Sequence, residues 1–461
     1  MKNIRNKEYL LWTMIGFIML VVYINMATLD VPVINDYIRE INNYVGDGKI
    51  NGYLFSSVFF LQPPIKLLSS WINCSVFGFS VKMDLVLGAL GLALGAGVFG
   101  LYCTTYKMKR IPYIVLLFYI FSLSKWEMII NGTGWEHFWG FAGFWLHFYL
   151  LDLWYIHEEK EKGKSRLLVI LPIVNILGFA VFYGLVYSIV VTGFYLIIIL
   201  DKVKRKSVIR NEVIFALAVA VPIVIYIICS IVNSDTRVVA NGRIIDNFLQ
   251  DPFYFIQFFV MSFSSEIVGV ETVLGFANGE QIALMLGLVV ITFYIAFFLV
   301  NIVFKIYKET YMPLILLTYG FLNHGIVLAS RWGFNSITYG MSSRYSLQYM
   351  SGGIGILLTA YWLITNYKKR GIQRVVIVGS IFILIFGNGL TSWDEVHKAK
   401  YRKAFYDETK QMMYLYEDYT EEQLGERFNI DGQEVYKALT TLEQEQLSVW
   451  GSVSQKMREE E

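Results

Sequence analysis

Residues 277–304 read ANGEQIALMLGLVVITFYIAFFLVNIVF, and no charged residue follows Glu280 in this segment. An apolar run of this length can cross the ~30 Å hydrocarbon core of a bilayer as a helix. The rest of the chain has the same character: 56% of its 461 residues are hydrophobic, only 16% are charged, and the mean hydropathy is +0.50. These values exclude an ordinary water-soluble protein and predict an all-α, polytopic membrane protein.

Further apolar runs lie on both sides of this stretch. The eleven predicted spans cover residues 9–29, 83–106, 111–124, 138–156, 167–182, 184–200, 211–232, 277–304, 310–329, 346–366 and 375–391. The run 167–200 is divided into two short helices because basic clusters stand at both of its ends. A single helix would place those clusters on opposite sides of the membrane.

Lysine and arginine are distributed unevenly between the predicted loops. The N-terminus and the loops at 107–110, 160–166, 202–210, 305–308 and 368–374 hold 21 of the 39 basic residues, whereas the opposite loops before the C-terminal tail hold nine. Because cytoplasmic loops carry the excess of positive charge, the N-terminus is expected in the cytoplasm. An odd number of spans then predicts an extracytoplasmic C-terminus, in a multi-pass protein of a bacterial cell (inner) membrane.

Two outer segments of the predicted transmembrane domain, residues 1–391, have helical patterns of their own. In the first outer loop, residues 30–82, the stretch NDYIREINNYV predicts a helix lying on the membrane surface. Its apolar face comprises Ile34, Tyr37, Ile38, Ile41 and Val45. The outer segment 233–276 is predicted to contain a re-entrant or surface-lying helix, because its apolar part is too short and too polar at its end to cross.

The tail, residues 392–461, is acidic, with 16 acidic residues against nine basic ones after Trp393. It is predicted to form a small helical extracytoplasmic domain in which Asp431 and Glu434 make a capping box. The apolar stripe of that helix is Val435, Leu439 and Leu442. Residues 420–447 also resemble a helix-turn-helix, but the acidic balance and the outside placement oppose DNA binding, so no nucleic-acid partner is expected.

Two arginines mark the stretch RWGFNSITYGMSSRYSLQYM, residues 331–350. Arg331 and Arg344 can anchor the ends of spans by reaching toward lipid headgroups. Their guanidinium groups also suit bidentate contacts with a phosphate. His324 lies in the preceding span and Tyr345 follows Arg344, so we expect these residues to surround a lipid-linked phosphate or the group attached to it.

Two carboxylates at the other outer loop allow both a structural and a chemical interpretation. Asp30 follows the first span and Asp36 lies six residues later. Asp30 can simply mark the water boundary, and Asp36 can cap the surface helix. Ionisable groups at the rim of a membrane bundle are also frequent functional groups.

An aromatic belt, KWEMIINGTGWEHFWGFAGFW at residues 125–145, contains Glu136 and His137 beside Trp135. Such belts usually anchor a protein at the interface, and sugar rings also stack on indole faces, so these three residues are candidates for substrate binding. His137, His147 and His157 recur every ten residues, which spreads them too far along a helix to bind one metal ion. No cofactor is expected, although a divalent cation stays open.

Several stretches together resemble the GT-C class of membrane glycosyltransferases, and more closely an uncharacterised bacterial branch of polytopic proteins. They are INDYIREINNYVGDGKINGYLF (34–55), KLLSSWINCSVFG (66–78), NGTGWEHFWGF (131–141), SRWGFNSITYGMSSRY (330–345) and ALTTLEQEQLSVW (438–450). Their order along most of the chain carries the resemblance, since no single stretch is as specific as a metal-binding motif.

The resemblance implies a GT-C-like fold and transfer of a sugar from a polyprenyl-phosphate donor to a cell-surface glycan or lipid-linked acceptor. It implies that Asp36, or second Asp30, is the general base, and that Arg344 and Arg331 hold the donor phosphate. Where related sequences carry a His–Arg pair, this chain reads FFLQPPIK (59–66), which leaves Gln62 and Lys66 as polar replacements.

Three alternatives stay open at this point. A glycan repeat-unit polymerase also acts on polyprenyl-linked substrates with arginines. A lipid or glycan transporter would show paired repeats and charges at mid-membrane depth, whereas the charges here gather at the outer rim. A non-catalytic membrane protein is the third alternative, because the QPP stretch departs from the pattern of the family.

Overall fold

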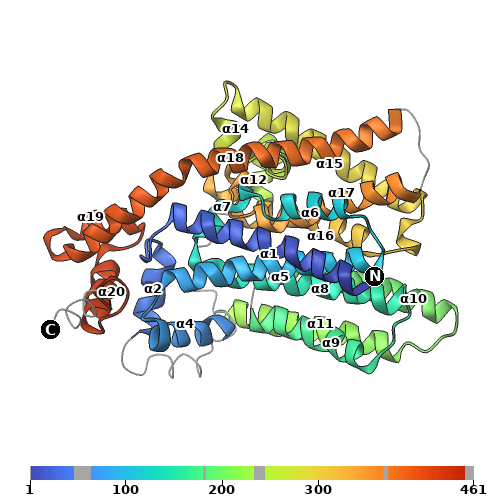
Figure 1. The fold of residues 1–461 in the computed structure, drawn as a ribbon, viewed down its shortest axis with the longest axis horizontal. Helices are drawn as coiled ribbons and strands as arrows, with labels where there is room; N and C mark the ends of the chain where they lie inside the picture. The colour runs from blue at the N-terminus through green and yellow to red at the C-terminus, as the bar shows by residue number, and fades with distance from the viewer. Residues whose placement is uncertain (1, 46–63, 180–182, 233–243, 367–371, 452–461) are drawn as a thin grey trace.

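The described part of the chain folds as helices only. The computed structural model describes residues 2–45, 64–179, 183–232, 244–366 and 372–451, and within these ranges it has α-helices, short 3₁₀ turns and one π segment but no strand. The long helices run side by side as a bundle (Figure 1). This confirms the prediction of a polytopic, all-helical membrane protein.

Each of the eleven predicted spans overlaps an α-helix in the described part of the chain, although residues 180–182 of the span 167–182 lie outside the described residues. These helices are α1 Lys2–Ala27, α5 Val81–Thr105, α6 Arg110–Ile120, α8 Trp135–Tyr155, α9 Lys162–Ile173, α10 Gly184–Lys204, α11 Arg210–Val232, α15 Gly279–Val303, α16 Met312–Arg331, α17 Ser346–Asn366 and α18 Ile372–Tyr414. Within the described ranges, nine segments are long and apolar enough to cross a membrane, and α8 and α9 are not among them. In α8, His147 and Asp152 interrupt the apolar sequence, and α9 has 12 residues before it continues as the π segment Val174–Gly178.

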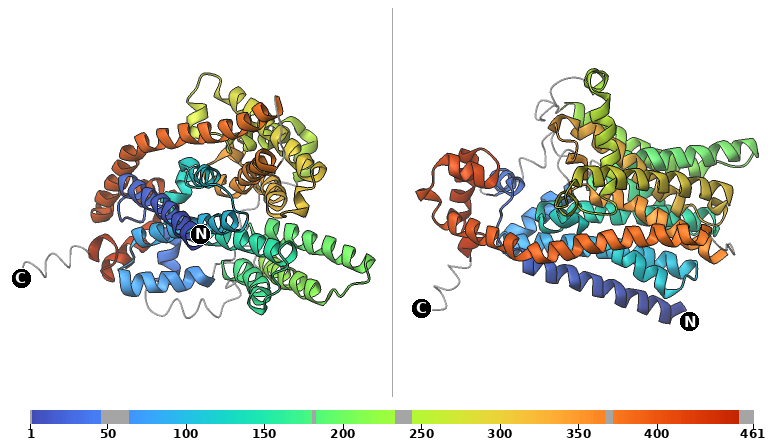
Figure 2. Two further views of the ribbon diagram at one scale, coloured as in Figure 1. Left: turned by 45° about the vertical axis from the view of Figure 1, so that its right-hand side comes forward. Right: turned by 90° about the horizontal axis from the view of Figure 1, so that it is seen from above.

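The two ends of the bundle carry different parts of the chain. Figures 1 and 2 place the N-terminus at one end, and the helices α19 (Glu421–Phe428) and α20 (Gly432–Gln444) at the other. We call these the N-terminal end and the tail end. The 107–110 loop lies at the N-terminal end, where Arg110 Nε is 2.6 Å from Glu8 Oε1. The 305–308 loop is near it, because the Tyr106 hydroxyl donates to the carbonyl of Glu309.

Helix α18 continues without a break from the bundle into the tail. It has 43 residues, so the predicted domain boundary at 391 falls inside a single helix. Ion pairs one or two turns apart accompany its outer half, with Lys398 Nζ 2.6 Å from Asp394 Oδ2 and Arg402 Nη2 2.5 Å from Glu395 Oε2. Such pairs stabilise a helix after it leaves the apolar environment. Its exposed apolar stripe is Val375, Val378, Phe382, Phe386, Leu390, Trp393 and Val396.

The predicted helix of the first outer loop is confirmed as α2, Asn35–Tyr44. Its apolar face, including Tyr37, Ile38 and Ile41, is fully buried, whereas a helix on the membrane surface would turn this face toward lipid. Protein covers it instead: the Tyr37 ring centre lies 5.9 Å from that of Phe79, and the Tyr37 hydroxyl donates to Asp84 of α5 at 3.2 Å. Helix α2 also packs against α20, where Asn42 Nδ2 donates to the carbonyl of Glu434 at 2.9 Å. The tail therefore fixes the orientation of α2.

The tail helix predicted from the apolar stripe is α20, and Val435, Leu439 and Leu442 are buried. The Asp431 carboxylate caps its first turn by accepting from the backbone N–H groups of Gln433 and Glu434. The reciprocal capping box of the tail lies one helix earlier, between Thr420 and Gln423 of α19.

The outer segment 233–276 contains short helices in its described part. The apolar one is α13, Pro252–Ser264, which has 13 residues and is too short to cross a membrane. Asp251 caps it by accepting from the backbone N–H of Tyr254 at 3.1 Å. It packs closely on α15 at Gly287, where a Cβ atom would clash with the carbonyl oxygen of Val260. A short apolar helix is therefore present in this segment, and the prediction that it is re-entrant or lies on the membrane surface stays a prediction.

Candidate functional site

Two cavities flank the loop that joins α7 (Trp126–Ile130) to α8 at the tail end. The first, which we call the acidic cavity, measures about 280 Å³. It is lined by Asp36, Arg39, Glu40, Asn43, Lys66, Met128, Asn131, Thr133, Gly134, Glu136 and His137. Three carboxylates face two basic side chains and one imidazole, so the acidic cavity favours ligands that donate hydrogen bonds.

Helix α2 forms one wall of the acidic cavity. Asp36, Glu40 and Asn43 stand at positions i, i+4 and i+7, which places them on one face, away from the buried apolar face of the same helix. The Asp36 side chain is half exposed and lies 3.6 Å from Arg39 Nη1. Glu40 is buried. The sequence pattern of acidic residues one turn apart therefore marks the lining face of α2.

Lys66 enters the acidic cavity from α4, Pro64–Phe77. Its Nζ atom donates to the carbonyl of Thr133 at 3.0 Å and lies 3.5 Å from Glu40 Oε2. The other oxygen of Glu40 accepts from the Ser70 hydroxyl, also on α4. Burial lowers the pKa of the Lys66 ammonium, but the negative charges of Glu136 and Glu40 outweigh it and raise that pKa above its ordinary value.

The loop between α7 and α8 turns tightly beneath both cavities. The side-chain Oδ1 atom of Asn131 accepts from the backbone N–H of Thr133 at 3.1 Å and from the Thr133 hydroxyl at 2.6 Å, which is a side-chain turn that asparagine favours. Gly132 is required here because a Cβ atom would clash with the Tyr37 hydroxyl. This turn starts α8, so Glu136 and His137 reach the cavity from its first turn.

Two polar atoms of that first turn are buried without a partner. Glu136 is 4% exposed, and its Oε2 atom has no hydrogen-bond partner among the described residues. The Nδ1 atom of His137 is likewise buried and unpartnered within the described part of the chain. Buried polar atoms in native proteins are nearly always satisfied, so these two atoms indicate a place where a ligand or water binds.

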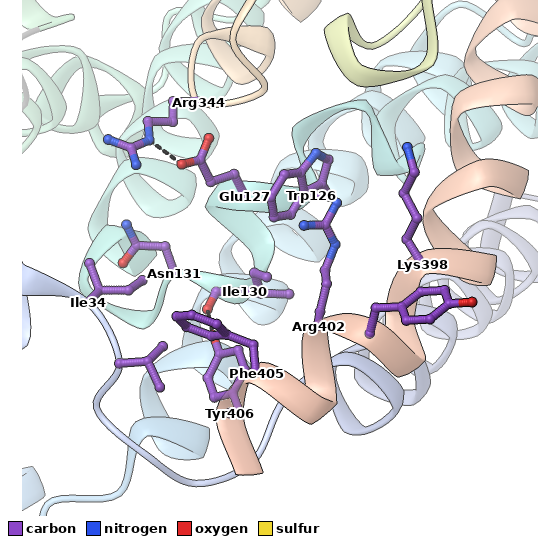
Figure 3. Close-up of a pocket in the computed structure, with 12 residues that line it drawn as sticks. Ile34, Trp126, Glu127, Ile130, Asn131, Arg344, Lys398, Arg402, Phe405 and Tyr406 are labelled. Atoms are coloured by element: carbon purple, nitrogen blue, oxygen red, sulfur yellow. Dashed lines mark hydrogen bonds and ion pairs between the residues drawn. The ribbon is translucent and has the colours of Figure 1, made fainter. Parts of the chain in front are cut away.

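The second cavity, which we call the basic pocket, measures about 490 Å³ and is shown in Figure 3. It is lined by Val33, Ile34, Trp126, Glu127, Ile130, Asn131, Arg344, Lys398, Tyr401, Arg402, Phe405 and Tyr406. Its charged lining has three basic side chains and one carboxylate. The basic pocket therefore favours an anionic ligand, the opposite of its neighbour.

Arg344 stands at the rim of the basic pocket with part of its hydrogen-bonding capacity unused. Its Nε atom pairs with the Glu127 carboxylate, which also accepts from the Ser343 hydroxyl at 3.1 Å. The two terminal nitrogens have no hydrogen-bond partner among the described residues, and the side chain is 55% exposed. Partial burial lowers the pKa of the guanidinium, but the charge of Glu127 outweighs it and raises that pKa. The terminal nitrogens can thus bind an oxyanion while Glu127 holds Nε.

Helix α18 supplies the opposite wall, which the sequence alone did not assign to the site. The Arg402 guanidinium lies 3.1 Å from the centre of the Trp126 ring, and the Tyr406 hydroxyl donates to the carbonyl of Ile130 at 3.0 Å (Figure 3). Lys398, Arg402 and Phe405 follow at i, i+4 and i+7. This spacing places the three side chains on one helical face and could have predicted their role in the site. The predicted domain boundary at residue 391 assigned them to a separate tail instead.

The predicted site residues divide into two groups. Asp36, Lys66, Glu136 and His137 line the acidic cavity and Arg344 lines the basic pocket, while Asn131 belongs to both. The structure thus brings five of them to one end of the bundle. Gln62 lies outside the described residues.

Asp30 and Trp135 have structural positions. The Asp30 carboxylate accepts from the Ser80 hydroxyl at 2.8 Å and from the backbone N–H of Lys82 at 3.0 Å, so it caps the start of α5. Trp135 is buried, with its ring 6.4 Å from that of Trp139, and it lines neither cavity. Asp30 therefore has a structural role at the start of α5 and lines neither cavity.

Arg331, Tyr345 and His324 lie apart from both cavities. The Arg331 guanidinium is 5.9 Å from the Tyr345 ring centre. His324 is fully buried inside the bundle, where its ring stacks on Tyr349 and its nitrogens contact Ser262 at 2.9 Å and Glu266 at 3.1 Å. None of these three lines the acidic cavity or the basic pocket.

Comparisons of the chain with protein-family models, curated proteins and solved structures find no match. Within the described residues, no group of three or more His, Cys, Asp or Glu side chains has an arrangement that could hold a metal ion. The functional assignment consequently depends on the residues of the two cavities.

Proposed function

We propose that this protein is a GT-C-like membrane glycosyltransferase that moves a sugar from a polyprenyl-phosphate donor to a glycan or lipid-linked acceptor. The observation that carries the proposal is the pair of oppositely charged cavities that share Asn131. Glycosyl transfer from a phosphate carrier needs a base for the acceptor and a cation for the departing phosphate, and the two cavities supply these groups on adjacent surfaces.

In the proposed reaction, the Asp36 carboxylate takes the proton of the acceptor hydroxyl. The acceptor oxygen then forms a bond to the anomeric carbon of the donor sugar, and the bond from that carbon to the phosphate oxygen breaks. The electron pair leaves with the polyprenyl phosphate. The free terminal nitrogens of Arg344 stabilise the charge that develops on this leaving group.

We place the tail end of the bundle on the extracytoplasmic side of the bacterial cell membrane. The reason is the position of the basic loops: the 107–110 and 305–308 loops belong to the N-terminal end, and an excess of Lys and Arg favours the cytoplasm. Both cavities would then open on the side where polyprenyl-linked sugars are used.

The test is transfer by the purified protein from a panel of radiolabelled polyprenyl-phosphate sugars. Replacing Asp36 with Asn removes the base, and replacing Arg344 with Ala removes the phosphate ligand, so each variant is expected to lose about 100-fold in kcat/KM. Arg205→Ala is the matched control, since Arg205 is 73% exposed and belongs to the basic 202–210 loop.

Two outcomes would oppose the proposal. Wild-type rates in both Asp36→Asn and Arg344→Ala, at normal protein levels, would remove both residues from the mechanism. Movement of an intact lipid-linked sugar across vesicles, without transfer to any acceptor, would favour the transporter.

A further inference from the structure

The acidic cavity contains one carboxylate more than its cations can pair. Asp36 lies 3.6 Å from Arg39, and Glu40 lies 3.5 Å from Lys66. Glu136 forms no ion pair among the described residues, although it is 4% exposed and its Oε2 atom faces the cavity without a hydrogen-bond partner. A buried carboxylate is costly unless it is paired or protonated. The Lys66 ammonium is near enough for its charge to act on Glu136, but no described cation forms an ion pair with this carboxylate, so its Oε2 atom is available to a further hydrogen-bond donor.

The other groups of the cavity restrict what that cation can be. The Lys66 ammonium is held by Glu40 and by the carbonyl of Thr133, and it acts on Glu136 through its charge without forming an ion pair with it. A phosphate would meet three carboxylates here, whereas a primary ammonium can donate to Glu136 and to His137 Nδ1. The volume of about 280 Å³ is near the lower end of the range of roughly 300–1,000 Å³ for ligand sites. One small polar unit fits this size.

We propose that the acidic cavity binds a primary ammonium group on the acceptor, held by the carboxylate of Glu136. This inference rests on the proposed function, because it takes the acidic cavity as the acceptor side of the site. The ammonium could belong to an amino sugar or to an ethanolamine headgroup, which share this chemistry.

The experiment measures ligand-induced thermal stabilisation of the purified full-length protein in detergent at pH 7. The probes are glucosamine, N-acetylglucosamine, glucose and ethanolamine. We expect glucosamine to raise Tm in a saturable way and the two neutral sugars to have at least tenfold weaker effects. Ethanolamine binding as tight as that of glucosamine would assign the ammonium to a headgroup, and weaker binding would assign it to an amino sugar.

Glu136→Gln separates the two states of the side chain, because glutamine has the shape of a protonated carboxylic acid but cannot pair with a cation. We expect it to weaken glucosamine binding at least tenfold. Glu280→Gln, at an exposed position at the start of α15, is the matched control and should bind as the wild type does. Unchanged glucosamine binding by Glu136→Gln would overturn the proposal.

The wild-type protein alone keeps the test decisive if Glu136→Gln fails to fold. Equal binding of glucosamine and N-acetylglucosamine would overturn the ammonium site without any variant. Transfer to a neutral acceptor with no glucosamine binding would overturn it and leave the glycosyltransferase proposal standing. Glucosamine binding without transfer activity would support the ammonium site and oppose the glycosyltransferase proposal.

Discussion

The acidic cavity and the basic pocket share Asn131 but balance their charges differently. In the basic pocket every cation has a carboxylate partner: Arg344 pairs with Glu127, Lys398 with Asp394 and Arg402 with Glu395. In the acidic cavity, the Glu136 carboxylate forms no ion pair with a basic side chain among the described residues. The net charge of a cavity therefore does not locate its ligand. The groups without a partner among the described residues do so, and they are the terminal nitrogens of Arg344 in the basic pocket and the Glu136 carboxylate in the acidic cavity.

The largest effect is expected from breaking the central pair of the acidic cavity. Replacing Glu40 with Ala removes the carboxylate that lies 3.5 Å from the Lys66 ammonium and leaves only the charge of Glu136 near it, and removing one member of a largely buried ion pair costs about 3 kcal/mol. Chemical denaturation of the purified protein would measure this loss. The double variant Glu40→Gln with Lys66→Met should recover most of it, and a double variant as unstable as Glu40→Ala would contradict the pairing.

A smaller loss of stability is expected from a change to Arg402 in the basic pocket. Replacing Arg402 with Lys keeps a charge for Glu395 but removes the planar group that lies over Trp126, which should cost about 1–2 kcal/mol in the same measurement. Arg39→Lys is the control, because Arg39 is 57% exposed and its surface ion pair contributes little. An equal loss in both variants would mean that the stacking on Trp126 has no special role.

The smallest effect separates the two candidate bases. Replacing Asp30 with Ala removes the carboxylate that accepts from the N-cap residue Ser80 and from the Lys82 backbone N–H at the start of α5, which should cost about 1 kcal/mol of stability and leave sugar transfer near the wild-type rate. Parallel transfer assays of Asp30→Ala and Asp36→Asn measure this directly. Loss of transfer in the Asp30 variant alone would exchange the roles assigned to the two aspartates.

Much of the fold could be predicted because its signals are local. An apolar run long enough for a bilayer specifies a helix, and each predicted span overlaps one. The apolar face of α2 was readable from its spacing, but the surface that covers it was not. Tyr37 on this face contacts Phe79 and Asp84, and α2 also packs against α20, nearly 400 residues later. No periodicity within α2 can indicate whether lipid or protein packs there.

The site was predictable only where charged residues stand in unusual places. Asp36, Glu136 and Arg344 were found by this signal and Lys66 through the family resemblance, and the structure gathers all four around one loop. The same signal selected His324, whose imidazole is instead buried between aromatic rings. A polar residue inside an apolar run gives the same sequence pattern whether it lines a cavity or is buried in the core, because the sequence does not show which residues surround it in space.

Because α18 is continuous, its length gives the height of the basic pocket relative to the membrane core. Its lipid-type stripe from Val375 to Val396 is about 32 Å long at 1.5 Å per residue, close to the ~30 Å thickness of a hydrocarbon core. With that stripe matched to the core, Lys398 and Arg402 stand roughly 3 and 9 Å beyond its edge. Lipid phosphates occupy this layer, so the helix that anchors the chain also sets the height at which a carrier headgroup would be met.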